Sequence, residues 1–390
     1  MNILGIVAEF NPFHSGHAYL IDKARLLGAT HTVCVMSGNF VQRGDIAVCS
    51  KKARAEMALC SGVDLVLELP VTFATATAQR FAYGAVAVLA ALGCVNRIAF
   101  GSECGDTDRL KSVADVLGDE RVLTRTREIM QNGITFAAAR QAALNDCGYD
   151  GDILRNPNDT LAVGYIDAIN TLGAAIIPLA IKRAGVAHDG GAVGEFASAS
   201  HLRELIKKGG SIEKFVPQSA FEIIKREIAC GRAPMSIDRL ETAVLARLRT
   251  MSPDDMAALP DISEGLENRL FKAVQEQTGM NGIIDAVKSK RYTHARIRRI
   301  VLSALLGIDK TVYGINPQYI RILGMNERGR EILSAASPAL PIIARAKDAE
   351  NISAEGKILL SAEQRADNLA GLAAKPIQPC ESTLSQTVIM

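Results

Sequence analysis

The chain has 390 residues, of which 48% are hydrophobic and 22% are charged, and its formal net charge is +2. This length fits two domains, or one α/β domain with a helical extension, and the composition favours neither a disordered nor a fibrous protein. The net charge is too mild to predict a nucleic-acid-binding protein, so such a role requires a local basic patch.

The sequence contains no recognisable secretion signal or membrane span. The first residues, MNILGIVAEFNPF, lack a basic leader, a long apolar run and a small-residue cleavage site. No segment approaches the roughly 18 apolar residues that a membrane span requires. Eight cysteines without a CxxC pair argue against a zinc site or a disulfide framework. We therefore expect a cytoplasmic protein without a membrane segment.

Short apolar runs alternate with helical patterns in the first half of the chain. Residues 2–7 form the first run, and after a loop a helical pattern continues to about Leu27. Four further apolar runs follow, at 31–36, 64–70, 96–102 and 174–183. This alternation predicts a doubly wound parallel sheet covered on both faces. The segment from about 105 to 173 is mostly helical, and we interpret it as an insertion between two strands.

The second half of the chain has a different pattern. After about residue 210 strand-like runs vanish and amphipathic helical patterns dominate. We therefore predict an α/β domain over residues 1–210 and an all-helical domain over residues 211–390.

The segment Asn11-Pro12-Phe13-His14-Ser15-Gly16-His17 lies directly after the first predicted strand and opens the first helix. A helix N-terminus offers unpaired N–H groups and a positive dipole end, and a glycine lets a phosphate approach the backbone. Histidines three residues apart can both face a triphosphate and stabilise the charge that develops as pyrophosphate leaves. The alternative is that both are incidental surface histidines near a turn.

A second segment, Ser198-Ala199-Ser200-His201-Leu202-Arg203, also suits phosphate binding, because hydroxyl groups and a guanidinium bind phosphate oxygens directly. Its plain alternative is a helix start in which Ser198 or Ser200 is the N-cap and Arg203 is exposed. The pairing with HSGH favours possible phosphate contacts from Ser198, Ser200 and Arg203.

The HSGH segment resembles the HxGH motif of nucleotidyltransferases, and SASHLR resembles their SSTxIR sequence. Longer segments resemble the bacterial tRNA(Met) cytidine acetate ligase family over nearly the whole chain. They are GIVAEFNPFHSGH, MSGNFVQRGD, GVDLVLELP, FGSE, NPNDTLAVGY, IKR and SKRYTHARIRR. Asn156 stands where the family has a serine, and Ala199 replaces the second serine of SSTxIR. The resemblance implies an α/β nucleotidyltransferase domain over residues 1–210 and a tRNA-binding helical domain over residues 211–390.

The resemblance also implies a reaction. ATP activates acetate as acetyl-adenylate, and the acetyl group passes to the wobble cytidine of elongator tRNA(Met) without acetyl-coenzyme A. His14 and His17 are then the catalytic residues. The implied ATP contacts are Val7, Ala8, Glu9, Phe10, Asn11, Pro12, Phe13, His14, Ser15, Gly16, His17, Ala18, Tyr19, Leu20, Gly101, Asn158 and Arg183. Taken alone, Gly101 also fits a strand-ending turn, Asn158 a helix cap and Arg183 a solvated strand end.

Two questions about the site stay open in the sequence. The loop MSGNFVQRGD, in which Gly38 and Gly44 flank Arg43, either approaches the phosphates or the RNA, or is a mobile surface loop. We expect Mg²⁺ to accompany the triphosphate, and Glu68 and Glu103 end predicted strands nearby. Dispersed carboxylates do not identify its ligands, which remain unknown.

The basic segment around residues 288–299 is the main indication of RNA. No Asp or Glu occurs from Ala286 to Ile308, and an apolar helical stripe leaves the arginines on its flanks. We predict tRNA contacts from Lys290, Arg291, Arg296 and Arg299, against the alternative of a merely solvated basic face. Two other functions compete with the ligase: a small-molecule adenylyltransferase of coenzyme biosynthesis, and a non-catalytic RNA-binding protein.

Overall fold

An eight-stranded sheet forms the centre of the molecule. The computed structural model describes residues 1–184, 191–263, 265–380 and 387–390. The strand order is β11-β10-β5-β2-β1-β6-β7, and β12 also pairs with β10. The pairs from β5 to β7 are parallel, whereas β10 is antiparallel to β5. The strands are β1 (Ile3–Ala8), β2 (His31–Ser37), β5 (Leu65–Leu69), β6 (Arg97–Ser102), β7 (Ile177–Lys182), β10 (Ile320–Met325), β11 (Ile342–Ile343) and β12 (Val388–Ile389).

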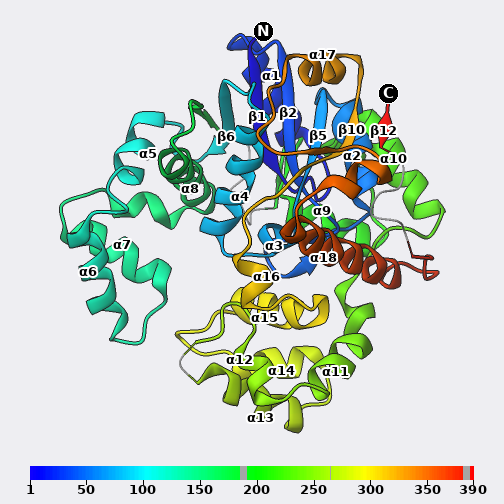
Figure 1. Ribbon diagram of the computed structural model, residues 1–390. Helices are drawn as coiled ribbons and strands as arrows, with labels where there is room; N and C mark the ends of the chain where they lie inside the picture. Colours follow the sequence, from blue (N-terminus) through cyan, green and yellow to red (C-terminus); the bar gives the residue numbers. More distant parts are fainter. Residues whose placement is uncertain (185–190, 264, 381–386) are drawn as a thin grey trace.

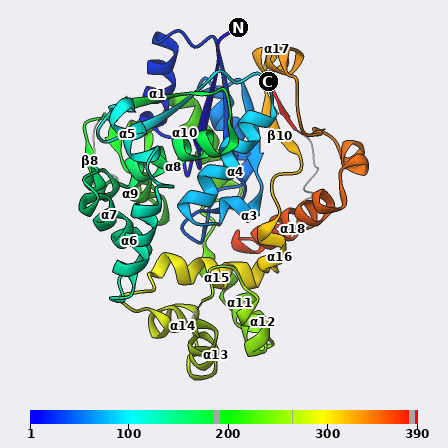
Figure 2. The same cartoon turned by 60° about the vertical axis from the view of Figure 1, so that its left-hand side comes forward.

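Helices pack on both faces of this sheet, which explains why every residue of β2 and β5 is buried. One face carries α3 (Val71–Ala74), α4 (Ala78–Ala91), α8 (Pro157–Leu172) and α17 (Glu327–Ala335). The other face carries α1 (Ser15–Leu26), α2 (Lys51–Cys60), α9 (Ala199–Lys207) and α10 (Gln218–Ala229). Figures 1 and 2 show these layers. The predicted α/β fold class is confirmed.

The predicted helical insertion lies between β6 and β7. It consists of α5 (Thr107–Ala114), α6 (Glu120–Met130), α7 (Phe136–Asp146) and α8, with a short 3-10 helix, η1 (Gly151–Arg155), before α8. Helix α8 covers the sheet through Ala162, Val163 and Ile166, whereas α6 and α7 lie farther out (Figure 1). Because β6 and β7 are neighbouring parallel strands, the insertion leaves the carboxyl end of β6 and returns to the amino end of β7.

A second, all-helical core lies beside the carboxyl ends of the strands. It is built from α11 (Glu241–Arg249), α12 (Pro253–Ala257), α13 (Leu266–Glu276), α14 (Met280–Val287) and α15 (His294–Leu306). The apolar stripe predicted on α15 faces this core, because Ile297, Ile300, Val301 and Ala304 are all buried. Short helix α16 (Lys310–Gly314) then leads back towards the sheet.

The prediction that residues 211–390 contain no strands is wrong. After α16 the chain returns to the sheet as β10, which lies between β5 and β11. The run IRILGM escaped notice because Arg321 interrupts a short apolar stretch. Its register partner on β5 is Glu68, and the two side chains form a buried ion pair of 3.1 Å. A charged residue is tolerated inside a sheet when a buried partner compensates it.

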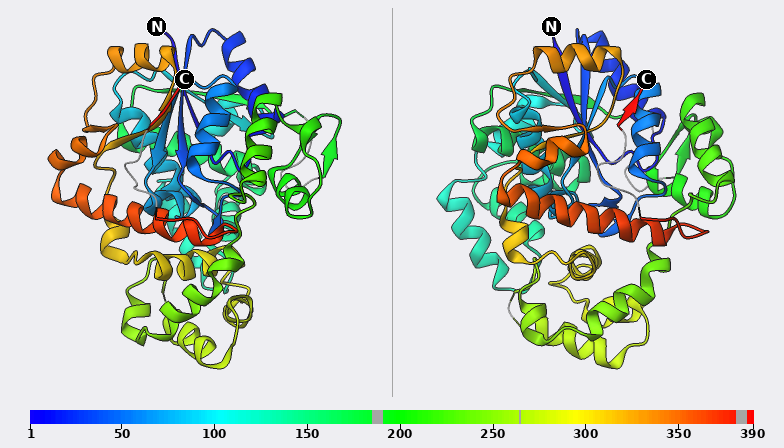
Figure 3. Two further views of the ribbon diagram at one scale, coloured as in Figure 1. Left: turned by 90° about the vertical axis from the view of Figure 1, so that its right-hand side faces the viewer. Right: turned by 45° about the vertical axis from the view of Figure 1, so that its right-hand side comes forward.

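The helical core and the sheet meet through a third apolar cluster. The hairpin formed by β3 (Phe40–Val41) and β4 (Asp45–Ile46) packs there with α15 and with α18 (Ala354–Ala370). Figure 3 shows α18 passing between the sheet and α15. At Gly44, whose φ is +73°, an added Cβ would lie 2.7 Å from the Arg299 backbone nitrogen. Only glycine fits a left-handed position this close to another backbone. The loop MSGNFVQRGD therefore touches the helical core.

Candidate active site

A cavity of about 480 Å³ opens at the carboxyl ends of β1, β6 and β7. In this sheet the strand order reverses between β1 and β6, and doubly wound folds bind ligands at such a point. The loop before α1 and the first turns of α8 and α9 complete the walls. The site residues predicted from the sequence that line the cavity are Val7, Ala8, Glu9, Phe10, Asn11, His14, Gly16, His17, Tyr19, Leu20, Gly101, Asn158, Arg183, Ser198, Ser200 and Arg203. Pro12, Phe13, Ser15 and Ala18 are not among the residues that line it.

The two motif histidines are fixed by their own helix start. His14 is the N-cap of α1, and its Nδ1 accepts a hydrogen bond of 3.1 Å from the Gly16 amide. The His17 Nδ1 accepts one of 3.2 Å from the His14 amide. Because both Nδ1 atoms accept, both rings carry their proton on Nε2. A Cβ on Gly16 would lie 2.9 Å from the His14 ring, so glycine is required between them.

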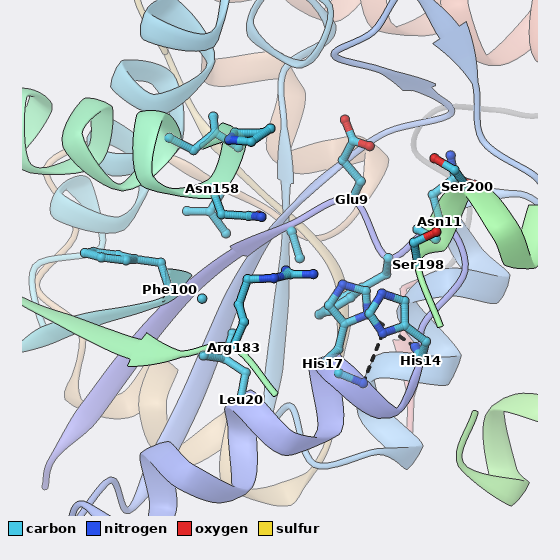
Figure 4. A pocket seen from close by; sticks show the side chains of 18 of the residues that line it. Glu9, Asn11, His14, His17, Leu20, Phe100, Asn158, Arg183, Ser198 and Ser200 are labelled. Atoms are coloured by element: carbon cyan, nitrogen blue, oxygen red, sulfur yellow. Dashed lines mark hydrogen bonds between the residues drawn. The ribbon is translucent and has the colours of Figure 1, made fainter. Parts of the chain in front are cut away.

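The two imidazole rings are stacked with centroids 3.7 Å apart, as Figure 4 shows. Burial, together with the Arg183 and Arg203 guanidinium groups, lowers the pKa of His14 to about 3. Burial and the neighbouring His14 and Arg183 hold the pKa of His17 well below its usual value. Both rings are therefore neutral near pH 7 in the ligand-free protein. They offer Nε2–H donors without adding charge of their own.

The charge of the cavity wall is strongly positive. Its cationic side chains are Arg43, Arg155, Lys182, Arg183 and Arg203. Among the described residues that line it, Glu9 is the one carboxylate. Cations gathered in a concave site raise the local concentration of an anionic ligand. The electrostatics of the cavity therefore favour a polyanion such as a nucleoside triphosphate.

The segment SASHLR forms the start of α9 and contacts the histidine loop. The Ser198 Oγ is the N-cap and accepts a hydrogen bond from the His201 amide, so the capping alternative holds for Ser198. Arg203 donates to the Asn11 carbonyl oxygen at 3.0 Å and to the Ser200 Oγ at 3.1 Å. Arg203 is thus not a solvated surface residue, because it joins α9 to the loop that precedes the histidines.

Asn158 lies across the cavity from the two histidines (Figure 4), and Gly101 also lines the cavity. A Cβ on Gly101 would lie 3.3 Å from the Arg183 Cγ, so this glycine lets the Arg183 side chain cross the end of β6. The Asn158 side-chain amide donates a hydrogen bond to the Glu103 carboxylate at 2.5 Å, and the Asp159 backbone N–H donates to the same carboxylate at 2.9 Å. Both oxygens of the Glu103 carboxylate therefore accept hydrogen bonds from the start of α8.

Asp159 supports the site without lining the cavity, and the sequence analysis missed it. Its fully buried carboxylate accepts hydrogen bonds from the Ser102 hydroxyl and from the Glu103 and Cys104 amides. These bonds hold the loop after β6 against α8, and Phe100 and Gly101 on that strand line the cavity. An acidic residue in the first turn of a helix was the available signal, but its partners lie far away in the sequence.

Arg54 on α2 was also missed, and it holds the loop before the histidines from behind. Its guanidinium is completely buried and donates to four backbone carbonyl oxygens. The acceptors belong to Glu9 at 2.6 Å, Ser37 at 3.1 Å, Cys49 at 3.2 Å and Gly38. Phe10, which follows Glu9, has a left-handed backbone with φ of 45°. Such a conformation persists only where neighbouring contacts enforce it.

Aromatic side chains cover the apolar part of the cavity. Phe100 and Tyr165 are buried with ring centroids 5.7 Å apart, and Phe81 and Leu161 line the same cavity. Ligand pockets combine such apolar walls with a few placed polar groups. This wall suits a planar base, whereas the cationic wall suits phosphates.

Glu68 does not reach the cavity. Lys51 bridges it to Asp367 on α18, with Nζ to carboxylate distances of 2.6 Å to each. Burial raises the pKa of Glu363 well above its ordinary value, which keeps this neighbouring acid protonated. Lys51 and Arg321 then balance Glu68 and Asp367, so the cluster is neutral without a metal ion. Within the described residues, Glu68 and Glu103 both have structural partners and form no common magnesium site.

This site and fold define the class of the protein. A family model described as HIGH Nucleotidyl Transferase matches residues 1–385. The class is therefore that of nucleotidyltransferases with paired histidines at the first strand-to-helix turn, as the HSGH segment predicted.

Two groups of known proteins narrow the class. A tRNA(Met) cytidine acetate ligase of Thermoanaerobacter sp. is 42% identical in an alignment of 359 positions, which covers 88% of this chain and 89% of that protein. One from Syntrophomonas wolfei is 41% identical over 85% and 84% of the two chains. The crystal structure of Thermotoga maritima TmcAL bound with alpha-thio ATP is 35% identical and has a TM-score of 0.92 over the full length of both chains. The chain belongs to the tRNA(Met) cytidine acetate ligase family, which confirms the resemblance.

Proposed function

We propose that this protein is an ATP-dependent ligase that activates acetate and acetylates N4 of the wobble cytidine of elongator tRNA(Met). The names of its relatives and the ATP analogue in the Thermotoga maritima structure support this function. The observation that carries it is the pair of neutral, stacked imidazoles, which face a cavity with five cationic side chains. This arrangement binds a triphosphate and stabilises its transition state by electrostatics.

In the first step an acetate oxygen attacks the α-phosphorus, the bond to the β-phosphate breaks, and pyrophosphate leaves. The Nε2–H groups of His14 and His17 donate to the phosphate oxygens on which charge accumulates. No proton transfer is needed. Mg²⁺ would be held chiefly by the phosphate oxygens, since the described lining offers only the Glu9 carboxylate. When bound, it neutralises phosphate charge.

The helical core is the proposed tRNA-binding part, and the structure changes which cations we assign to it. The Arg296 guanidinium donates to the Asp261 carbonyl oxygen at 2.7 Å, and Arg299 pairs with the Asp261 carboxylate at 3.1 Å. These two groups are engaged within the protein. Lys288, Lys290 and Arg298 are exposed, and no described residue forms a hydrogen bond or ion pair with their side chains. We assign phosphate contacts to them and keep Arg291 as predicted.

In the part of the chain that the structure describes, no helix is long and apolar enough to cross a membrane. Because the proposed RNA substrate is cytoplasmic, we propose the same compartment for this chain.

The test is mass spectrometry of nucleosides from tRNA(Met) incubated with enzyme, ATP and labelled acetate. We expect labelled N4-acetylcytidine, and none from a transcript with uridine at the wobble position. Labelled acetyl-coenzyme A in place of ATP and acetate should give no product. Pyrophosphate exchange that ignores acetate would instead favour a small-molecule adenylyltransferase.

A further inference from the structure

The Glu9 carboxylate is an unexpected group in a phosphate-binding cavity. It lies directly after β1 and is the one acidic side chain among the described lining residues. Figure 4 shows its carboxylate pointing away from the two imidazole rings. A carboxylate beside a triphosphate weakens the binding of that anion by charge repulsion. We therefore take Glu9 out of the ATP contacts that the resemblance implied, because its placement is explained if it faces a different substrate, one that presents hydrogen-bond donors.

The hairpin that touches the helical core holds this carboxylate in place. The Gln42 amide donates to the Glu9 Oε1 at 2.9 Å, and the Gln42 side chain is fixed by the Ala76 carbonyl oxygen at 3.2 Å. Two residues later, Gly44 packs against the backbone of α15. No described residue donates a hydrogen bond to Oε2. Glu9 is therefore set at the junction between the ATP cavity and the proposed RNA-binding core, with one oxygen that no described residue engages.

The acceptor base brings the donor that this oxygen lacks. The exocyclic amine of cytosine donates hydrogen bonds, and carboxylates recognise it in protein–nucleic acid complexes. This amine is a weak nucleophile because its lone pair is delocalised into the ring. As it attacks a carbonyl carbon its N–H becomes acidic, so a positioned carboxylate that accepts the proton accelerates the step.

We propose that Glu9 is a catalytic residue of the acetyl-transfer step, accepting a hydrogen bond and then a proton from the cytosine amine. This inference rests on the proposed function. The amine nitrogen forms a bond to the acetyl carbon, and the bond from that carbon to the phosphate oxygen breaks. AMP leaves with the electron pair. The amine proton passes to the Glu9 Oε2 and then to solvent when the product departs.

The experiment separates the two steps with Glu9→Gln, which keeps an oxygen for the Gln42 amide but cannot act as the base. Adenylate formation is followed by acetate-dependent ATP–pyrophosphate exchange. Acetyl transfer is followed in single turnovers at saturating tRNA(Met). Hydroxylamine replaces tRNA in a third assay, because this strong nucleophile needs no base. Glu204→Gln is the matched control, since it makes the same change at an exposed acid on α9 that does not line the cavity.

We expect Glu9→Gln to retain most of its exchange and acetyl-hydroxamate formation, but to transfer acetyl to tRNA slower by about 10²-fold or more. Glu9→Asp should recover part of the transfer rate, and Glu204→Gln should behave like the wild type. An equal loss in all three assays would place Glu9 in the ATP or Mg²⁺ site and overturn the proposal, as would unchanged transfer. A wild-type enzyme without acetate-dependent exchange would instead refute the proposed function itself.

Discussion

The HSGH turn and the basic helix α15 both contain candidate functional residues, but the side chains of the two regions have partners at different distances along the sequence. The hydrogen bonds that orient His14 and His17 span two and three residues of sequence. The bonds that engage Arg296 and Arg299 reach Asp261, 35 and 38 residues earlier in the chain. A functional side chain is thus predictable from sequence where its partners are local. A run of basic residues says nothing about which of them have a distant acidic partner.

The largest effect is expected at the local site. His14→Ala and His17→Ala each remove an Nε2–H donor, so acetate-dependent pyrophosphate exchange should fall by about 10²-fold or more per donor. His201→Ala is the matched control, because this histidine starts α9 but does not line the cavity. Circular dichroism should show that all three variants are folded. Wild-type exchange in both motif variants would contradict the assigned role.

A smaller effect is expected at the distant partner of the basic helix. Asp261→Ala leaves the half-buried Arg299 without its anion and should destabilise the helical core by about 1–3 kcal/mol. Urea unfolding measures this loss. The competing idea, that Arg299 serves RNA, predicts that releasing it tightens tRNA binding. If Asp261→Ala binds tRNA more tightly and unfolds at the same urea concentration as the wild type, Arg299 is not a structural residue, and the prediction is wrong.

The neutral state of the histidines has a consequence for stability and pH. The pKa of His14 is about 3 in the folded protein and about 6.5 in the unfolded chain, so the unfolded chain binds the proton more tightly. Stability is therefore full above pH 6.5 and is lost as the pH falls from 6.5 towards 3. The unfolding free energy should decline there by up to about 1.4 kcal/mol per pH unit for each such group. His14→Asn retains an N-cap but removes this contribution, so its urea-derived stability should fall less steeply with acid. A slope equal to that of wild type would argue against a neutral, buried His14.

The smallest effect concerns salt. If the exposed cations meet tRNA phosphates, Lys290→Ala with Arg298→Ala should flatten the log–log salt dependence of tRNA binding by about one to two units. ATP affinity should hardly change. Arg328→Ala with Arg330→Ala on α17, at the opposite end of the molecule in Figure 1, is the charge-matched control. If the wild type and both double variants show the same salt dependence of tRNA binding, Lys290 and Arg298 do not contact the RNA.

The strand β10 shows most clearly what sequence analysis could not reach. Its second residue, Arg321, breaks the apolar pattern, and the burial of this arginine is explained only by its ion pair with Glu68 on a strand far away in the sequence. Asp159 and Arg54 were missed for a related reason. Both bind backbone groups of segments distant in sequence, and backbone groups leave no signature in the sequence.

The sequence by itself determined the alternation of strands and helices, the position of the paired histidines and the glycine between them. These follow from side-chain periodicity and from hydrogen bonds within one helical turn. Only the tertiary structure decided that the chain returns to the sheet after the helical core, and that Asp261 takes two arginines out of the basic face. It also decided that Glu9 is held by the hairpin beside α15. Each of these depends on groups brought together from distant parts of the chain, where burial sets their partners and their charge.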